Sequence, residues 1–431
     1  MAGDLQSFAV GDHMLQWRRV EARSIWGRRE FLHSGSRLTC LPAVSRANKK
    51  SSSVNLKLLA IQLILCWLAF VSQATAAKFE VLPETANTFD LTTEERLSED
   101  FPSKIAPFYA TGTSGEFVGK EGKKIRYRTF ALSDRATERG AIVISSGRTE
   151  GMIKYQELIY DLSRQGYSVY IHDHRGQGYS ERINPKKPEL GLVESFDYYV
   201  DDLNTFVETV VKPANHKRLF LLSHSMGGAV ASLYLARYPN VFRAAVLSSP
   251  MHQPSMPGPA GSLCTLIRFT SLFAGESRFV LGKKSWTDVD TKDKHRFDAD
   301  RNDLTHSNAR YDRMIEQYRQ TDHEKDGWPS PKLGGPSPKW TKEACRAGSL
   351  SRSDPIINAI KTPILLLQAG GDTIVSLEAQ VEFCDKVNNV RHTSCKGYKV
   401  ADARHELFIE SDKYRQPALV TAITFFNKYS E

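Results

Sequence analysis

The chain contains few cysteines, and none of them shows the paired spacing of a zinc site. It also lacks a stripe of basic residues interleaved with aromatics, which is typical of nucleic-acid binding. The net charge of +9 is uneven, because residues 1–76 carry ten basic and four acidic residues. The remaining body is only mildly basic, so we expect no nucleic-acid partner. Its composition is that of an ordinary globular protein, and 431 residues can hold a large α/β domain with insertions.

The apolar run near the start of the chain is too short for a typical membrane span. It extends from Leu58 to Val71, whereas a transmembrane helix needs about twenty residues. Lysines precede the run and small residues follow it, which predicts a secretory signal or an uncleaved anchor with a basic tail. We interpret residues 54–77 as a signal peptide or membrane anchor, and residues 1–53 as a basic extension or an over-long start. The body is expected to be exported or membrane-anchored in the cell envelope, in the periplasm or inner membrane if bacterial.

Four of the six cysteines lie in the body, and they could form disulfides if the body is exported to an oxidising compartment. Cys384 and Cys395 stand on either side of a short link between a helix and a strand, so they could pair locally. Cys264 and Cys345 would then form the second pair. Buried free thiols are the alternative for these residues.

Apolar or alternating runs predict strands at 124–130, 141–144, 168–171, 218–222, 242–247 and 363–367. Helical patterns separate them, at 155–162, 198–211, 229–236 and 418–429. This alternation is typical of an α/β fold with a mostly parallel sheet and helices on both faces. We place the core at 120–250 and 362–431, after a polar lead-in at 78–119. Residues 251–361, with clustered prolines and amphipathic helices around 263–281, predict an inserted helical cap.

A strand, a sharp turn and a helix meet at Ser225, within the sequence LSHSMGG of residues 222–228. This is the context in which a nucleophile elbow presents a serine hydroxyl. The turn is so tight that the residues two before and two after the nucleophile must be small, and Ser223 and Gly227 meet this condition. Ser223 as the nucleophile would put Leu221 at a small-residue position, so we choose Ser225. The alternative interpretation is a glycine-rich helix start with capping serines.

Ser225 is followed along the chain by a candidate acid and a candidate base. A serine becomes a good nucleophile when a histidine takes its proton and a carboxylate orients that histidine. Asp372 ends an apolar strand on a glycine-containing loop, and His405 lies just ahead of the last helix. Alone, Asp372 could be a turn residue and His405 a helix-start residue. Together the three predict a triad in the order of this architecture, and such a triad implies neither a metal nor a cofactor.

Acyl transfer also needs an oxyanion hole, in which two backbone N–H groups face the oxygen of the tetrahedral intermediate. Met226, directly after the nucleophile, is predicted to supply one. Arg148, in the loop after the strand at 141–144, is predicted to supply the other. Loss of one such donor typically raises the barrier by about 3 kcal/mol.

Further motifs make the chain resemble the α/β-hydrolases of the monoacylglycerol lipase and lysophospholipase L2 type. They are GR at 147–148, YQEL at 155–158, DHRGQGYS at 173–180, DYYVDDL at 197–203, HSMGG at 224–228, LTHS at 304–307, GGP at 334–336 with Trp340, and HE at 405–406. The resemblance spans most of residues 120–430 and implies an α/β-hydrolase fold with the same triad. It also implies an ester hydrolase acting on lysophospholipids or monoacylglycerols. Where many relatives have His-Gly in the oxyanion loop, this chain has Ser146-Gly147.

Other histidines lie near the expected site. We expect His172 and His174 to be structural hydrogen-bonding residues of their loop, and His224 to pack beneath the elbow. Apolar cap helices would suit an acyl chain and a membrane surface. Two alternatives are a peptidase of the proline-iminopeptidase kind, with the same fold and triad, and a binding protein on an inactive hydrolase scaffold. The oligomeric state is left open.

Overall fold

The computed structural model describes residues 79–255, 264, 278–280, 282–290, 295–320 and 328–431. The chain divides into two units, Met1–Ala74 and Thr75–Glu431, and all described residues belong to the second. The expected extension, the signal or anchor and most of the expected cap helices around 263–281 lie outside the described residues. Within the described residues, no helix combines the length and the apolar character needed to cross a membrane.

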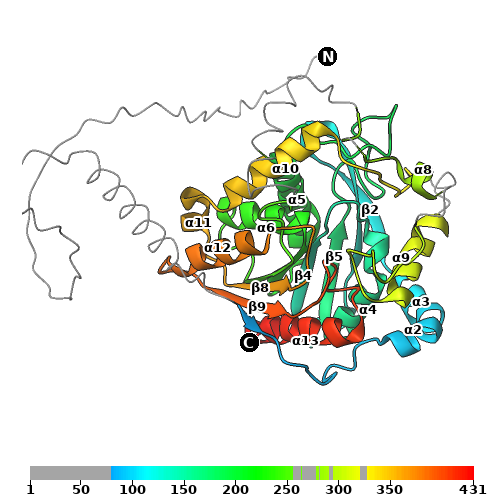
Figure 1. Ribbon diagram of the computed structural model, residues 1–431. Coiled ribbons are helices and arrows are strands. Elements are labelled where there is room, and N and C mark those ends of the chain that lie inside the picture. The colour runs from blue at the N-terminus through cyan, green and yellow to red at the C-terminus, as the bar shows by residue number, and fades with distance from the viewer. Residues whose placement is uncertain (1–78, 256–263, 265–277, 281, 291–294, 321–327) are drawn as a thin grey trace, which may run out of the picture. The chain divides into compact units, whose positions relative to one another are not determined.

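A nine-stranded sheet forms the centre of the fold, in the order β1-β9-β8-β7-β6-β4-β5-β3-β2 (Figure 1). Only the β2–β3 and β3–β5 pairs are antiparallel, and the other neighbours are parallel. The strands are β1 (Glu80–Val81), β2 (Thr113–Val118), β3 (Lys124–Phe130), β4 (Gly140–Ser145), β5 (Tyr167–His172), β6 (Leu219–His224), β7 (Ala244–Ser248), β8 (Ile364–Ala369) and β9 (Cys395–Val400). The predicted mostly parallel α/β sheet is confirmed.

The central strands are buried on both faces, which explains their continuous apolar sequences. Every residue of β4, β5, β6, β7 and β8 is buried. Successive side chains point to opposite faces, so Leu219 and Leu221 of β6 join one core cluster, and Phe220 and Leu222 join the other. The sheet therefore separates two apolar layers.

Helices cover both faces of the sheet (Figure 1). One layer contains α5 (Asp197–Phe206), α6 (Met226–Arg237), α10 (Pro338–Ser351), α11 (Asp354–Ala359) and α12 (Leu377–Asn388); the other contains α4 (Gln156–Arg164), α9 (Asn308–Gln320) and α13 (Asp412–Lys428). The shorter helices are α2 (Glu94–Asp100), α3 (Ala106–Ala110) and α8 (Trp286–Asp290), and α4 follows the 3-10 turn η3 (Met152–Tyr155).

The boundaries of the lead-in, the insertion and the last helix differ from the expectation. β1 and β2 both lie in residues 78–119 and form the two edges of the sheet, so the lead-in belongs to it. Edge strands are half exposed, and β2 accordingly lacks an apolar pattern.

Within 251–361, α10 and α11 contact α6 of the core. The last helix starts at Asp412, six residues before the expected start, and Pro417 lies inside it as its sixth residue, where it lacks a backbone N–H to donate.

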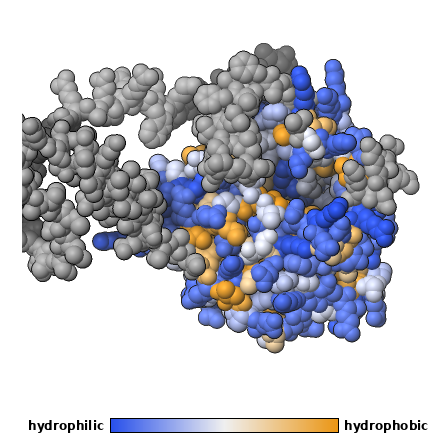
Figure 2. Space-filling view, viewed as in Figure 1, coloured by the Kyte–Doolittle hydropathy of each residue, from blue (hydrophilic) through white to orange (hydrophobic). Residues whose placement is uncertain are grey.

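The face of the molecule in Figure 2 is mostly hydrophilic, with one larger hydrophobic group near its middle and smaller hydrophobic spots elsewhere. Val81 and Val118 are the large hydrophobic residues that stand exposed among the described residues, and each belongs to an edge strand. The other large apolar side chains of the described residues are at least partly buried, most of them in the two layers beside the sheet. Leu97, Phe101 and Ile105 form a smaller third cluster.

Candidate active site

Ser225 occupies a strained turn between β6 and α6. Its φ of 51° and ψ of −119° are unfavourable for a residue with a side chain. Gly227 permits this turn, because a Cβ there would lie 2.1 Å from the Ser145 carbonyl oxygen. Ser223, two residues earlier, is fully buried in the sheet. The local geometry is that of a nucleophile elbow with Ser225 at its tip.

Asp372 and His405 lie together at the carboxyl edge of the sheet, after β8 and β9. His405 Nδ1 is 2.7 Å from Asp372 Oδ2, and both side chains are buried. The other Asp372 oxygen accepts hydrogen bonds from the backbone of Ile374 and Val375. Burial alone would raise the pKa of Asp372, but His405 and these N–H groups lower it. The aspartate is therefore held as a carboxylate that can orient the ring of His405.

Ser225 lies on the neighbouring loop, but its hydroxyl is not bonded to the base. The ring of His224, one residue earlier, has its centroid 4.8 Å from that of His405. Within the described ranges, no hydrogen bond joins Ser225 Oγ to His405 Nε2. Catalytic hydrogen bonds are often long without substrate, so Ser225 remains a candidate for the same site.

The predicted oxyanion loop lies against the elbow. A Cβ at Gly227 would meet the carbonyl oxygens of Ser145 and Ser146, so α6 begins directly beside this loop. The Met226 N–H belongs to the first turn of α6, where N–H groups lack intrahelical acceptors. The Gly147 N–H donates to Glu150 Oε2 at 2.5 Å, which fixes the loop just before Arg148. The roles of Met226 and Arg148 as oxyanion donors stay predictions.

The side chain of Arg148 is a cation without an acidic partner among the described residues. Its Nη2 donates to the Gly334 carbonyl at 2.6 Å, and its guanidinium lies 5.0 Å from the centre of the Trp340 ring. Its Nε is buried without a hydrogen-bond partner, and burial lowers the pKa of Arg148 to about 10. Among the described residues, no carboxylate lies within 4.0 Å of its nitrogens. This residue therefore offers a positive charge beside the predicted oxyanion loop.

A buried ionic cluster lies behind the elbow, and we define it as Glu150, Lys154, His224 and Glu406. Lys154 Nζ is 2.8 Å from Glu150 Oε1 and 2.6 Å from Glu406 Oε2. His224 Nδ1 is 2.8 Å from Glu150 Oε1. Our sequence reasoning expected His224 beneath the elbow but missed this cluster. Its only sequence signal is adjacency, since Glu406 follows His405 and Glu150 lies three residues after Gly147.

The cluster also contains a donor set of the kind that binds metals. One atom each of Glu150, His224 and Glu406 lies within 4.8 Å of the others. Lys154 already donates to both carboxylates, and it supplies positive charge where a metal ion would supply it. These residues are therefore satisfied as an ionic network of the protein's own side chains.

The histidines at the end of β5 differ in part from the expectation. His174 Nε2 lies 3.2 Å from Ser145 Oγ, as a structural role requires. The prediction of hydrogen bonds for His172 is wrong, because both of its ring nitrogens are buried without a partner. Its ring packs against Phe206, with centroids 5.0 Å apart, and burial lowers its pKa well below the ordinary value. A neutral aromatic ring therefore occupies this position.

Both expected cysteine pairs are joined in the structure. Cys384, in α12, is bonded to Cys395 at the start of β9, with Cα atoms 5.2 Å apart. Cys264 is bonded to Cys345 of α10, with Cα atoms 5.8 Å apart and a sequence separation of 81. The second bond ties the beginning of the inserted segment to a helix that packs on the core.

Comparisons with known proteins identify the family to which the chain is similar. Residues 136–412 match the family described as serine aminopeptidase, S33. Lysophospholipase L2 of Escherichia coli K12 is 31% identical over 331 residues, which cover 76% of this chain and 91% of that protein. Monoglyceride lipase of Rattus norvegicus is 38% identical over 134 residues, covering 31% and 42%. The crystal structure of a soluble monoglyceride lipase variant from Saccharomyces cerevisiae with a substrate analog gives a TM-score of 0.56 at 18% identity, covering 74% and 96%.

The family match covers more than half of the chain, and the similarity to lysophospholipase L2 covers nearly all of that relative. The structural similarity to the yeast enzyme supports the fold. The expected fold class and the family resemblance are therefore confirmed. The chain belongs to the serine aminopeptidase S33 family and is an α/β-hydrolase of the lysophospholipase L2 and monoglyceride lipase type, a carboxylic ester hydrolase.

Proposed function

We propose that this protein is a lysophospholipase, which cleaves the single acyl ester of a lysophospholipid. The observation that carries the proposal is the similarity to lysophospholipase L2 over 91% of that relative, whereas the match to rat monoglyceride lipase covers 42% of that enzyme. Monoacylglycerol is therefore the second candidate substrate. The two substrates share the acyl ester and differ in the charged headgroup.

In the proposed mechanism, the Ser225 hydroxyl attacks the ester carbonyl while His405 accepts its proton. Asp372, 2.7 Å from His405, orients the ring and stabilises the imidazolium that forms. The N–H groups of Met226 and Arg148 stabilise the oxyanion. The leaving alcohol takes the proton from His405, which leaves an acyl-enzyme on Ser225. Water, activated by His405, then releases the fatty acid.

Arg148 supports a substrate that carries a phosphate. Among the described residues, its guanidinium contacts the Gly334 carbonyl and the Trp340 ring, and no carboxylate neutralises it. Guanidinium groups bind phosphates through charge-assisted hydrogen bonds, which are stronger than neutral ones. A lysophospholipid would bring such an anion close to the oxyanion loop, whereas a monoacylglycerol would not.

The two disulfides support the proposal that the body lies in an oxidising compartment of the cell envelope, either exported or anchored at the membrane. Substrates of this class reside in membranes, so the enzyme would work at a membrane surface. Labelling of free thiols in the denatured but unreduced protein taken from cells tests this proposal, because denaturation exposes the buried cysteines. Four unreactive cysteines in the body are expected, and four reactive ones would contradict it.

A lipid panel tests the activity itself. The protein is incubated with lysophosphatidylcholine, monoacylglycerol and an aminoacyl amide, and the products are identified by mass spectrometry. We expect fatty acid from the lysophospholipid at the highest kcat/KM. Release of amino acid from the amide would instead favour the peptidase alternative. Ser225→Ala should abolish acyl release and fluorophosphonate labelling, while retained labelling would contradict the assigned nucleophile.

A further inference from the structure

His224 has a hydrogen-bond acceptor facing each of its ring nitrogens. Its Nδ1 is 2.8 Å from Glu150 Oε1, and its Nε2 is 3.2 Å from the carbonyl oxygen of His405. Glu150 also accepts from Lys154 and from the Gly147 N–H, so it is itself a carboxylate. A carboxylate and a carbonyl oxygen only accept, so both ring nitrogens of His224 must donate. Only the doubly protonated imidazolium has two N–H donors.

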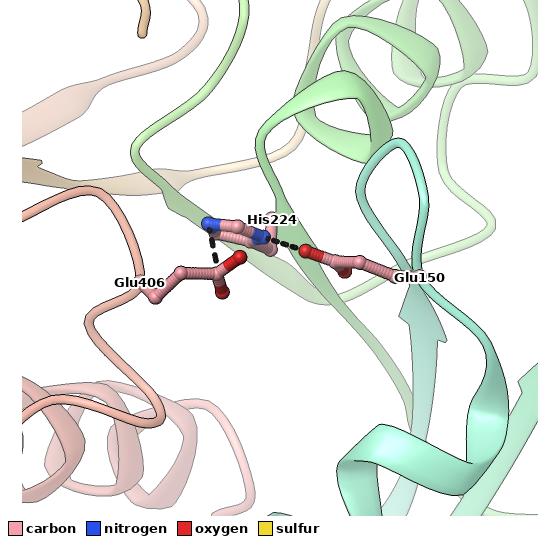
Figure 3. Close-up of side chains that lie close together, drawn as sticks. All are labelled: Glu150, His224 and Glu406. Atoms are coloured by element: carbon pink, nitrogen blue, oxygen red, sulfur yellow. Dashed lines mark hydrogen bonds and ion pairs between the residues drawn. The ribbon is translucent and has the colours of Figure 1, made fainter. Parts of the chain in front are cut away.

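The charges around His224 favour this cation. Figure 3 shows the ring between the carboxylates of Glu150 and Glu406, and its Nε2 lies 3.6 Å from Glu406 Oε2. Lys154 supplies only one positive charge against two carboxylates, so a charged His224 makes the buried cluster neutral. Burial opposes the charge, but the two carboxylates outweigh it, and the pKa of His224 is raised above its ordinary value.

The bonds of His224 reach three separate loops that carry the predicted catalytic groups. Through Glu150 they reach the Gly147 N–H, at the start of the oxyanion loop. Through the backbone carbonyl they reach His405, which lies on the loop between β9 and α13. His224 itself is the last residue of β6 and is joined covalently to Ser225. These segments are separated by more than seventy positions in the sequence and meet at this ring.

We propose that His224 is kept as an imidazolium by the buried cluster and acts as the positioning residue that fixes the oxyanion loop, Ser225 and His405 relative to one another. This inference rests on the proposed serine-hydrolase function. Displacement of a reacting group by about 1 Å can lower a rate about 100-fold, so small changes in this spacing affect turnover. Loss of the second proton from His224 removes one of its two bonds and loosens the arrangement.

Glu406→Gln tests the proposal with a neutral side chain of the same shape. It removes a carboxylate from Lys154 and from His224 but leaves Ser225, His405 and Asp372 in place. With p-nitrophenyl butyrate, we expect kcat to fall about tenfold or more while KM changes less than about threefold. The pH above which kcat declines should also shift downward, because His224 then loses its second proton more easily.

Glu157→Gln is the matched control. Glu157 is a buried carboxylate of α4, paired with Arg310 and 3.5 Å from Arg415, but it bonds none of the three predicted catalytic loops. Its loss should lower the thermal transition while kcat and the pH profile remain those of the wild type. Equal kcat and pH profiles in the two variants would overturn the positioning role of the cluster.

Ring 15N NMR of the histidines gives a readout on the unmodified enzyme. At pH 8 an ordinary histidine, with a pKa near 6.5, is neutral. We expect an imidazolium signal that persists above the pH at which an ordinary histidine becomes neutral and that is absent from the spectrum of His224→Gln. A neutral His224 in active wild-type enzyme would overturn the inference alone. A wild type without esterase activity would instead contradict the proposed function.

Discussion

At the scale of the residue, the backbone of Ser225 is the feature most closely tied to the proposed chemistry. Its positive φ directs the side chain out of the strand, and surrounding contacts hold it there. The Ser225 N–H donates to the Ser248 carbonyl at 3.1 Å, and its own carbonyl accepts from Gly228 and Met251. Such strain persists only where neighbours over-determine the conformation.

Gly227→Ala should therefore disturb the elbow. The new Cβ would lie 2.1 Å from the Ser145 carbonyl oxygen, so either α6 or the oxyanion loop must move. We expect kcat to fall about 100-fold or more, the effect of a displaced oxyanion donor, with a lower melting temperature. Esterase kinetics and a thermal melt measure both effects. Wild-type kcat in a folded Gly227→Ala protein would contradict this description of the turn.

Arg148→Met should change headgroup preference. The methionine keeps the stem of the side chain and removes the charge, so a phosphate would lose about 1.5–3 kcal/mol of charge-assisted bonding. We expect kcat/KM for lysophosphatidylcholine to fall about tenfold or more and that for monoacylglycerol to fall less than about threefold.

Arg182→Met is the control for this change, because the hydrogen-bond partners of Arg182 among the described residues are likewise backbone carbonyls, those of Ser180 and Ser330. It should affect both substrates alike. An equal loss on both substrates with Arg148→Met would mean that the arginine only anchors its loop to Gly334.

At the scale of the elements, the two disulfides constrain different lengths of chain. Cys264–Cys345 closes a separation of 81 residues, and Cys384–Cys395 closes one of 11. By loop entropy, the first should stabilise the fold by about 4.5 kcal/mol and the second by about 2.8 kcal/mol. The Cys264→Ala/Cys345→Ala variant should therefore unfold at lower urea than Cys384→Ala/Cys395→Ala. The reverse order would show that the long loop is already restricted in the unfolded chain.

Buried polar side chains also join elements to one another. In α9, Arg310 bonds Glu157 of α4 and Asp412 of α13, so one guanidinium links three helices. Glu410, in the loop before α13, accepts hydrogen bonds from the backbone N–H groups of His306 and Arg404. Residues of the inserted segment are thus tied to the core near the loop that carries His405.

At the scale of the whole molecule, the perturbed groups predict how stability varies with pH. Burial acts against the charge of Glu150 and Asp372, but their cationic and N–H partners lower both pKa values. A carboxyl group whose pKa is lowered in the folded protein stabilises the fold at pH values above its pKa in the unfolded chain, which is about 4. This stabilisation is lost as the pH falls through the pKa of the folded state.

Groups whose pKa is raised make the fold less stable as the pH increases. The pKa of His224 is raised, and burial raises the pKa of Asp173 to about 7. A group whose pKa is raised in the folded protein stabilises the fold at pH values below its pKa in the unfolded chain. This stabilisation is lost as the pH rises through the pKa of the folded state. We expect the urea midpoint to be highest between about pH 4 and pH 5, and to fall at more acidic pH and toward pH 8. A midpoint that rises steadily from pH 5 to pH 8 would contradict these pKa directions.

The sequence by itself determined the parallel sheet, the position of the elbow and the identity of the triad candidates. Each of these depends on a local pattern: continuous apolar strands, small residues around Ser225, and polar residues directly after strand ends. β1 and β2 could not be recognised this way, because an edge strand packs on one neighbour only and needs no apolar alternation.

Only the tertiary structure decided which buried polar groups meet. Glu150, Lys154, His224 and Glu406 come from three distant segments. The sequence placed His224 beneath the elbow, but it gave no sign that the other three side chains meet there. The role of His172 could not be predicted from its residue type either, because its buried neighbours make it a neutral ring that packs against Phe206. The energy of a buried charge depends on partners brought close by folding, and no local pattern records them.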